Sequence, residues 1–329
     1  FSHVEHKMIL GFKGLFLGIT DGATQMLMDF CLVGEKGKKG TYNLKQKQLD
    51  ARFKKERNED SHTAKRIKEY DESKIKLMIE MIKRLISRKI HFDYILADSW
   101  FACAEVIRFV TSRHVKCHYL GMIKMGKTKY HYNRKDYTAK ALVALFDHPK
   151  KGRKFSRNLG CYYVTVDVEF AGRKVRLFFT KRNKKSEWNA LITTNTELEF
   201  KEAYRIYSMR WSLEVVFKDS KGNLGLGKYQ MRNFASQIAC TAITAMQYNI
   251  LATARRFSSY ETIGGLFREV TRNSAELTIT ERIWGMIVDI VSEIAQCFEI
   301  EDEKIFEALI NRSDKLQHFI QIYELKIAS

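Results

Sequence analysis

Four polar residues in the second half of the chain have types and spacing that suit the binding of a metal ion and of phosphates. Tyr207, Arg210, Glu214 and Lys221 lie in the segment YSMRWSLEVVFKDSK. On an α-helix that advances about 100° per residue, they fall within one stripe about 60° wide. A carboxylate can ligate a divalent cation, an arginine can grip a phosphate with two N–H groups, and a lysine acts as a point charge. The residues between them include apolar ones that would pack the helix into a domain, namely Met209, Leu213, Val216 and Phe217.

Ion pairing along the helix explains the same residues without any site. Arg210 and Glu214 are spaced i, i+4, and so are Glu214 and Lys218. Such pairs stabilise a helix surface by about 0.2–0.5 kcal/mol each. From the spacing alone, a solvated helix face with mixed charge is as good an interpretation as a binding site.

A second carboxylate follows a short apolar run in the segment FDYILADSWF. Tyr94 to Ala97 is typical of a buried parallel strand, and Asp98 comes directly after it. The carboxyl end of a strand is where open α/β sheets place their ligands. The segment from Phe101 to Val110 then predicts a helix. Asp is also a favoured helix cap, so the alternative role for Asp98 is to cap that helix.

The spacing Y-x2-R-x3-E-x6-K resembles the YREK signature of the DDE transposases of insertion-sequence family four, the cut-and-paste group. The segment D-S-W-F resembles the motif that carries the second aspartate of the same family. The resemblance implies a catalytic domain with an RNase H-like fold, in which Asp98 and Glu214 are catalytic metal ligands. It also implies that transposon-end DNA is held by the remaining residues of the signature. With a neighbouring lysine and the later L-G-K-x-Q-x-R run, the candidate DNA contacts are Tyr207, Arg210, Lys218, Lys221, Lys228 and Arg232.

Cleavage and strand transfer need an activated attacking oxygen and a stabilised leaving oxygen, which two Mg2+ or Mn2+ ions about 4 Å apart provide. A third carboxylate is then required. The family places its first aspartate on a strand before the segment that opens this chain, and we expect that aspartate upstream of Phe1. Asp21 lies in a predicted turn, Asp29 on a neighbouring predicted strand, and Glu5 in a lead-in without a clear pattern. We therefore expect these 329 residues alone to bind DNA but not to cut it.

Two tryptophans accompany the candidate site residues. Trp100 belongs to the D-S-W-F motif, and Trp211 follows Arg210 directly. Indole rings can stack on unpaired bases. Packing in the hydrophobic core is the expected role of both, and stacking is the alternative.

The predicted elements form an α/β fold with a mixed sheet, flanking helices, a mostly β insertion and a helical C-terminal region. Two apolar runs around Asp21-Gly22 predict a hairpin between residues 11 and 33, and apolar spacing predicts a helix over residues 73–89. The polar stretch from residue 35 to 73 is either a solvated surface or a DNA contact. Strand patterns fill residues 115–192, and helices are predicted from residue 199, over 237–256 and beyond. The predicted parts are residues 1–112 and 193–256 for the catalytic core, 113–192 for the insertion and 257–329 for the helical region.

Composition points to a polyanionic partner. A net charge of +19 and a pI near 9.6 favour nucleic acid, and the resemblance implies double-stranded DNA, as transposon ends and target, bound by a homodimer. The six cysteines show no zinc spacing, and no apolar run is long enough to span a membrane, so we expect a cytoplasmic protein. Two other hypotheses remain: a domesticated DNA-binding protein without the metal site, and a basic RNA-binding scaffold.

Overall fold

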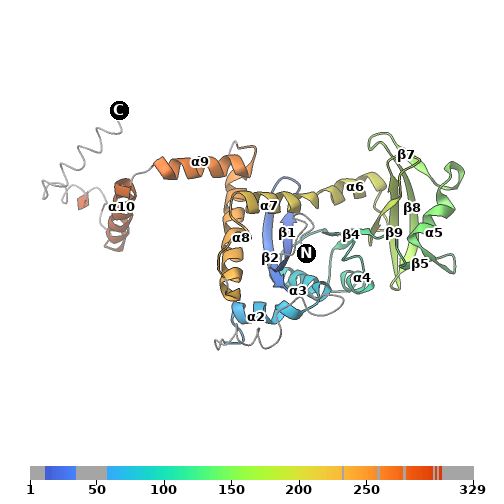
Figure 1. The fold of residues 1–329 in the computed structure, drawn as a ribbon, viewed down its shortest axis with the longest axis horizontal. Helices are drawn as coiled ribbons and strands as arrows, with labels where there is room; N and C mark the ends of the chain where they lie inside the picture. The colour runs from blue at the N-terminus through green and yellow to red at the C-terminus, as the bar shows by residue number, and fades with distance from the viewer. Residues whose placement is uncertain are drawn as a thin grey trace. The chain divides into compact units, whose positions relative to one another are not determined.

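The computed structural model divides into two compact units, residues 1–259 and residues 260–329. It describes residues 12–34, 58–231, 233–257, 260–276, 279–298, 301 and 304–305. Figure 1 gives the order of the elements along the chain. The first unit contains every described strand and both candidate carboxylates, so the site is built within it.

A β-hairpin opens the described chain. Strands β1 (Lys13–Thr20) and β2 (Gln25–Val33) pair antiparallel. In the turn, Asp21 Oδ1 accepts hydrogen bonds from the backbone N–H groups of Ala23 (3.0 Å) and Thr24 (2.8 Å). Gly22 has a φ of 92°, which glycine adopts without strain. The hairpin predicted from the Asp21-Gly22 signal is confirmed, with Asp21 in the turn and Asp29 on a strand.

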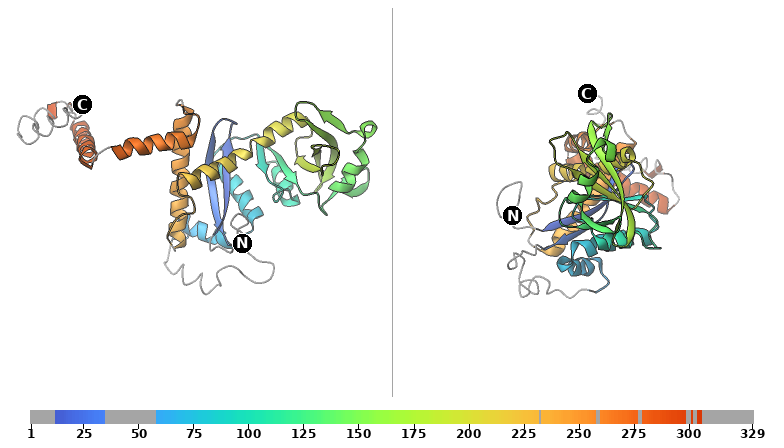
Figure 2. Two further views of the ribbon diagram at one scale, coloured as in Figure 1. Left: turned by 45° about the horizontal axis from the view of Figure 1, so that its top comes forward. Right: turned by 90° about the vertical axis from the view of Figure 1, so that its right-hand side faces the viewer.

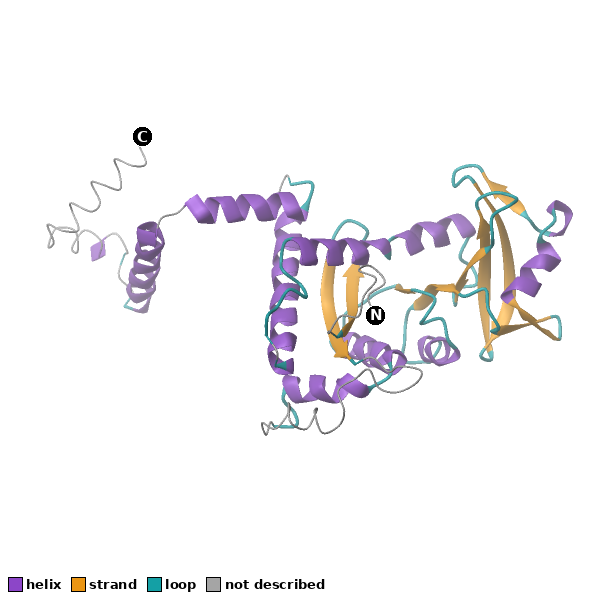
Figure 3. Ribbon diagram, viewed as in Figure 1, coloured by secondary structure: helices purple, strands orange, loops and turns teal. Residues whose placement is uncertain are grey.

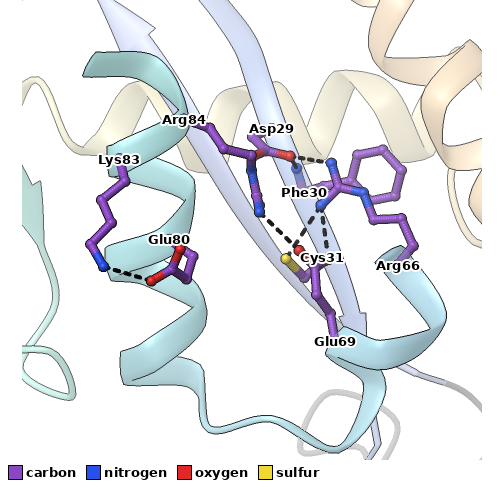
Figure 4. A network of polar contacts seen from close by, with 8 residues as sticks. All are labelled: Asp29, Phe30, Cys31, Arg66, Glu69, Glu80, Lys83 and Arg84. Carbon is purple, nitrogen blue, oxygen red and sulfur yellow. Dashed lines mark hydrogen bonds and ion pairs between the residues drawn. The ribbon is translucent and has the colours of Figure 1, made fainter. Parts of the chain in front are cut away.

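Ion pairs connect this hairpin to the neighbouring helices (Figure 4). Those elements are α2 (His62–Lys68), the 3-10 helix η1 (Glu69–Asp71) and α3 (Lys74–Ser87). Asp29, which is buried on β2, pairs with Arg66 and with Arg84, whose Nε lies 2.7 Å from Asp29 Oδ2. Glu69 pairs with the same two arginines, each at 3.0 Å. A buried carboxylate without such partners would be strongly destabilising, so Asp29 serves the fold here.

Helix α3 forms where the apolar spacing predicts it. The Ser73 hydroxyl caps its start by accepting a hydrogen bond from the Lys76 N–H at 3.2 Å. Its buried face recurs every three or four residues and packs against the hairpin and the main sheet; it comprises Leu77, Met78, Ile79, Met81, Ile82 and Leu85. The prediction for residues 73–89 is confirmed.

The other described strands form one eight-stranded mixed sheet. Its order is β3-β4-β10-β9-β8-β5-β6, with β7 paired to β8. The strands are β3 (Tyr94–Ala97), β4 (His118–Ile123), β5 (Lys129–Tyr132), β6 (Lys135–Thr138), β7 (Lys154–Ser156), β8 (Cys161–Phe170), β9 (Arg173–Lys181) and β10 (Asn189–Thr193). Only β3 and β4 run parallel; the other pairs are antiparallel. The predicted mixed α/β class is confirmed.

Strands dominate the region predicted as a β insertion, as Figure 3 shows. Helix α5 (Ala139–Phe146) and the 3-10 helix η2 (Pro149–Lys151) are its helical elements. Strand β8 buries alternate residues, including Val164, Val166 and Val168, because successive side chains of a strand point to opposite faces. Strands β4 and β10 share hydrogen bonds with each other and a sheet with β3, so the insertion continues the core sheet. The subdomain boundaries proposed within residues 1–256 stay a prediction.

In the described residues, the hairpin is not hydrogen-bonded to the eight-stranded sheet. Side-chain packing joins the two instead. Leu17 of β1 contacts both the core of the main sheet and the cluster that Leu77 and Met81 form with β2. The strand that the family pattern would place beside the hairpin is not among the described residues.

The predicted helix through the YREK segment is interrupted, which corrects the single-helix interpretation. It divides into α6 (Phe200–Ser208) and α7 (Trp211–Gly222), which follow each other from the neighbourhood of β8 to the hairpin (Figures 1 and 2). At the junction, the N–H groups of Met209 and Arg210 bond to the carbonyls three residues back instead of four. The Ser208 hydroxyl also donates to the Arg205 carbonyl at 2.6 Å. Such side-chain bonds compete with the helical ladder and bend it.

Helix α8 (Phe234–Arg256) packs along β2. The side-chain amide of Asn249 makes the hydrogen bonds that a neighbouring strand would otherwise make with Leu27. The Asn249 side chain accepts a hydrogen bond from the Leu27 N–H and donates one to the Leu27 carbonyl, both at 2.8 Å. Both backbone groups of Leu27 are therefore satisfied where β2 faces the helix. The predicted helix over residues 237–256 is confirmed.

The second unit is helical in its described part. It contains α9 (Ile263–Glu276) and α10 (Ile279–Cys297), which agrees with the prediction for the C-terminal region. Ile287, Ile290 and Ile294 on α10 are exposed. Among the described helices, none combines the length and apolar character needed to cross a membrane.

Candidate functional site

Asp98 lies directly beyond the only parallel pair of described strands. Ala97, the last residue of β3, pairs with Gly121 of β4, so the next residues of both strands enter the same edge of the sheet. Asp98 Oδ1 accepts a hydrogen bond from the Trp100 N–H at 2.9 Å, which fixes a tight turn. Helix α4 (Ala104–Val110) begins later, with Cys103 at its cap position. The alternative role of Asp98 as a helix cap is therefore wrong, and the predicted helix starts at residue 104 instead of 101.

Tyr119 of β4 is a buried residue of this region that the sequence did not reveal. It is fully buried, and its hydroxyl has no hydrogen-bond partner among the described residues. Burial raises the pKa of Tyr119 well above its ordinary value, and interactions with Tyr207, Cys103 and Asp98 add to that rise. A side chain at Gly121 would come within 2.5 Å of the Tyr119 hydroxyl, so this position requires glycine. The Tyr-x-Gly spacing within a strand is the only signal, and many strands contain it.

Tyr207 of α6 is the residue of the YREK segment that interacts electrostatically with Asp98. Its hydroxyl is buried and makes no hydrogen bond of good geometry to the described residues, although Arg210 and the Met122 backbone lie close to it. Burial raises the pKa of Tyr207, and the nearby Asp98 carboxylate acts in the same direction. The phenol therefore stays protonated and can donate a hydrogen bond.

Arg210 continues the contact chain to Glu214. The Arg210 guanidinium lies 5.8 Å from the centre of the Tyr207 ring, and its Nη2 lies 2.6 Å from Glu214 Oε1. Burial works to lower the pKa of Arg210, but the hydrogen bond to Glu214 and the neighbouring Tyr207 outweigh it and raise the pKa. Asp98 just after β3, Tyr207 on α6, Arg210 at the junction and Glu214 on α7 thus form a line of residues in which each interacts electrostatically with the next. The ion pair expected from the spacing is present as well.

The two candidate carboxylates offer oxygen ligands of the kind that Mg2+ prefers. One oxygen of Asp98 is occupied by the Trp100 N–H and one oxygen of Glu214 by Arg210. The second oxygen of each has no hydrogen bond to the described residues. In those residues, no three His, Cys, Asp or Glu side chains are grouped closely enough to hold a metal ion. A donor set of one or two carboxylates fits Mg2+ where water and substrate phosphates complete the shell.

The predicted DNA-contacting lysines are all exposed. Lys218 and Lys221 lie on α7, and Lys228 lies in the turn after it, where its N–H donates to the Gly225 carbonyl at 2.9 Å. None of the three forms an ion pair with a described residue, so their charges are open to solvent. Arg232 lies outside the described residues. The structure leaves their role in DNA binding a prediction.

The core-packing interpretation of the two tryptophans is wrong. Trp100 is 57% exposed and Trp211 is 61% exposed. Each belongs to a segment whose apolar neighbours face inward, such as Phe101 beside Trp100, and the indole is left on the outer side. The sequence could not predict the exposure of the two tryptophans, because the hydrophobic residues around each do not recur at a regular helical or strand spacing.

Comparisons with known proteins relate the part of the chain that contains this site to transposases. The sequence pattern of the family described as "Transposase DDE domain" matches residues 60–250. No curated protein shows significant similarity to the chain. A solved structure with a similar fold is the cryo-EM structure of a piggyBac transposase synaptic complex with hairpin DNA. It has 11% sequence identity and a TM-score of 0.44. The alignment covers 83% of this chain and 49% of the other, so the chain spans about half the length of that protein.

At that TM-score the structural similarity supports no conclusion about the site, and the family match carries the assignment. It covers more than half of the chain and includes both Asp98 and Glu214. The chain therefore belongs to the transposase DDE domain family, whose members carry out phosphoryl transfer on DNA with the help of divalent metal ions.

Proposed function

We propose that this chain is the catalytic region of a cut-and-paste DNA transposase of insertion-sequence family four, with an RNase H-like core. Its reaction would be metal-dependent strand cleavage and strand transfer at transposon ends. The observation that carries the proposal is the line of neighbours Asp98, Tyr207, Arg210 and Glu214. The hairpin, the helix α3 and the parallel strands β3 and β4 occur in the order that such a core requires.

Asp98 and Glu214 would hold the divalent metal, Mg2+ or Mn2+, in a site for two ions. When bound, the metal supplies charge stabilisation for the attacking and leaving oxygens of the phosphodiester. The protein residues position the DNA strand: Arg210 offers a bidentate fork to a phosphate, and the protonated Tyr207 hydroxyl donates to a phosphate oxygen. Arg210 would release Glu214 as it takes the phosphate.

The partner would be double-stranded DNA, both the terminal inverted repeats and the target, bound by a homodimer that pairs two ends. The net charge of +19 supports a polyanionic partner. The exposed Lys218, Lys221 and Lys228 extend the positive charge beyond Arg210 along the C-terminal half of α7 and the following turn. Arg232 is the further candidate contact of that turn.

A DNA-binding protein without metal chemistry is the second candidate. Two observations favour it: Glu214 is already held by Arg210, and the described residues contain no group of three metal ligands. In that case the Arg210–Glu214 pair would be a permanent part of the helix surface.

Metal binding separates the two candidates. We expect Mn2+ titrated into the protein to release or absorb heat in a calorimeter, and we expect Asp98→Ala to abolish that heat. Glu214→Gln keeps the size and hydrogen bonding of the side chain but removes its charge. In a complete transposase, it should leave DNA binding intact and abolish cleavage. Equal metal binding by the wild type and Asp98→Ala, or cleavage at a near wild-type rate in Glu214→Gln, would remove the proposed site.

A further inference from the structure

Two tyrosine hydroxyls near Asp98 have hydrogen-bonding capacity that the described residues leave unused. The hydroxyl oxygens of Tyr119 and Tyr207 are both enclosed by protein atoms, and neither has a hydrogen-bond partner among those residues. Buried hydroxyls usually find such a partner, as the hydroxyl of Tyr94 does by accepting a hydrogen bond from the Asn195 amide at 2.8 Å. The two unpaired hydroxyls therefore call for a bond that the protein makes only with its substrate.

Strand β4 leads the Tyr119 hydroxyl to the edge of the sheet that carries Asp98. The Tyr119 ring extends along the strand over Gly121, so that a Cβ atom at Gly121 would lie 2.5 Å from the hydroxyl oxygen. Gly121 is paired with Ala97, the last residue before Asp98. Because Tyr119 is fully buried, its hydroxyl can donate only to a group inside the protein.

Tyr207 reaches the same end of β4 from helix α6. Tyr207 and Met122 pack against the same hydrophobic cluster, and the backbone of Met122 lies close to the Tyr207 hydroxyl. After burial itself, Tyr207 makes the largest contribution to the raised pKa of Tyr119. The two phenols are therefore neighbours, and both stay protonated. Each can donate one hydrogen bond, and each oxygen can also accept.

We propose that Tyr119 is a positioning residue: when Tyr207 binds a phosphate of DNA, the Tyr119 hydroxyl donates a hydrogen bond to the Tyr207 oxygen. This inference rests on the proposed function, in which the Tyr207 hydroxyl donates to a phosphate oxygen. A hydroxyl has a single proton, so a donor behind the Tyr207 oxygen leaves that proton directed at the phosphate. Hydrogen bonds in such a chain polarise and strengthen one another.

The test measures binding of the full chain to a short fluorescent DNA duplex in EDTA, so that metal chemistry plays no part. We expect Tyr207→Phe to weaken binding about thirtyfold, the range for a hydrogen bond to a charged group, and Tyr119→Phe about fivefold, the range for a neutral one. Both hydroxyls serve one contact, so the double variant should bind no more weakly than Tyr207→Phe alone. Thermal unfolding of Tyr119→Phe without DNA should match the wild type, because the bond forms only in the complex.

Tyr248→Phe is the matched control. Tyr248 on α8 is also fully buried, and its hydroxyl has no hydrogen-bond partner among the described residues. The charged groups that act on its pKa are Asp219 and Arg255, and Asp98 is not one of them. The control removes the same oxygen atom as Tyr119→Phe, and it should leave DNA binding unchanged.

Several results would overturn the positioning role. Equal DNA binding by Tyr119→Phe and the wild type would refute it directly. Losses that multiply in the double variant, to about 150-fold, would show that Tyr119 acts independently of Tyr207. An equal loss in Tyr248→Phe would show that removal of any buried hydroxyl disturbs binding. Wild-type protein that does not bind the duplex would instead refute the proposed function itself.

Discussion

Arg210 has two possible partners, a carboxylate and a phosphate, and the structure shows the first. The pair with Glu214 involves side chains that are 26% and 41% exposed, so its contribution to stability is small, about 0.3–0.5 kcal/mol. A phosphate of DNA can accept two hydrogen bonds from the guanidinium, and this bidentate contact is stronger than the exposed pair with Glu214. Arg210 is therefore free to change partner when DNA arrives.

We expect Arg210→Ala to weaken DNA binding without unfolding the protein. If Arg210 neutralises one phosphate, the slope of log K against log salt should become shallower by about 0.9. Arg210→Lys keeps the charge and should restore the slope, although not the full affinity. A slope unchanged in the alanine variant, together with a large drop in thermal stability, would show that the residue serves the fold.

Tyr119 provides a second test at the residue scale. Because its buried hydroxyl has no partner in the described residues, Tyr119→Phe should leave the free energy of unfolding unchanged or raise it by up to about 1 kcal/mol. Tyr229→Phe is the matched control. The Tyr229 hydroxyl bonds to Cys240 O at 3.1 Å and contacts Thr244, so its loss should cost about 1 kcal/mol. Denaturant titration measures the free energy of unfolding of both variants. A clear loss of stability in Tyr119→Phe would mean that the Tyr119 hydroxyl is hydrogen-bonded in solution.

At the scale of elements, the hairpin β1–β2 is held in place by α8 and by the charges around Asp29. Helix α7 packs on the same hairpin, where Leu213 would contact a side chain at Gly18 and Phe217 meets Phe16 at a ring distance of 5.1 Å. The position of Glu214 thus depends on the hairpin. Any loss of hairpin packing should reach the candidate site through α7.

Substitution of Asn249 weakens this packing without changing a residue of the candidate site. Asn249→Leu leaves the Leu27 N–H and carbonyl unpaired beside the helix, and we expect the free energy of unfolding to fall by about 2–3 kcal/mol. Asn249→Asp retains the acceptor but loses the donor, so its cost should be intermediate. Urea titration measures both. Equal stability of the leucine variant and the wild type would mean that water satisfies Leu27 equally well.

At the scale of the whole molecule, all described strands and the candidate site belong to residues 1–259. The ion network around Asp29 and the contact of Asn249 with β2 also lie within this unit. The first unit therefore has a hydrophobic core and ion pairs of its own.

We expect residues 1–259 produced alone to unfold cooperatively and to bind DNA, because the unit has its own core. Circular dichroism during thermal unfolding and a salt-dependent binding assay check this, with the full chain as the control. A fragment that lacks a cooperative transition would show that residues 260–329 complete the core.

Local patterns in the sequence were sufficient for several elements. The Asp21-Gly22 signal predicted the hairpin, the apolar run from Tyr94 to Ala97 predicted β3, and the apolar period after Ser73 predicted α3. Each depends on residues close together in the chain, which is why periodicity and turn chemistry determine them. The types and spacing of Asp98 and Glu214 also singled them out, and the ion pair of Arg210 with Glu214 follows from helical spacing alone.

The tertiary structure decided which of these residues meet. Asp98 acts on the pKa of Tyr207 because β3 and β4 run parallel and α6 packs against β4, and neither fact is encoded in a local period. The burial of Tyr119 and the exposure of Trp100 likewise depend on what packs on each face of the sheet. The break between α6 and α7 arises where the Ser208 hydroxyl competes for a backbone carbonyl, an outcome that helix propensity does not predict. Contacts between distant segments are set by how the elements pack on one another, and local sequence patterns carry little information about that packing.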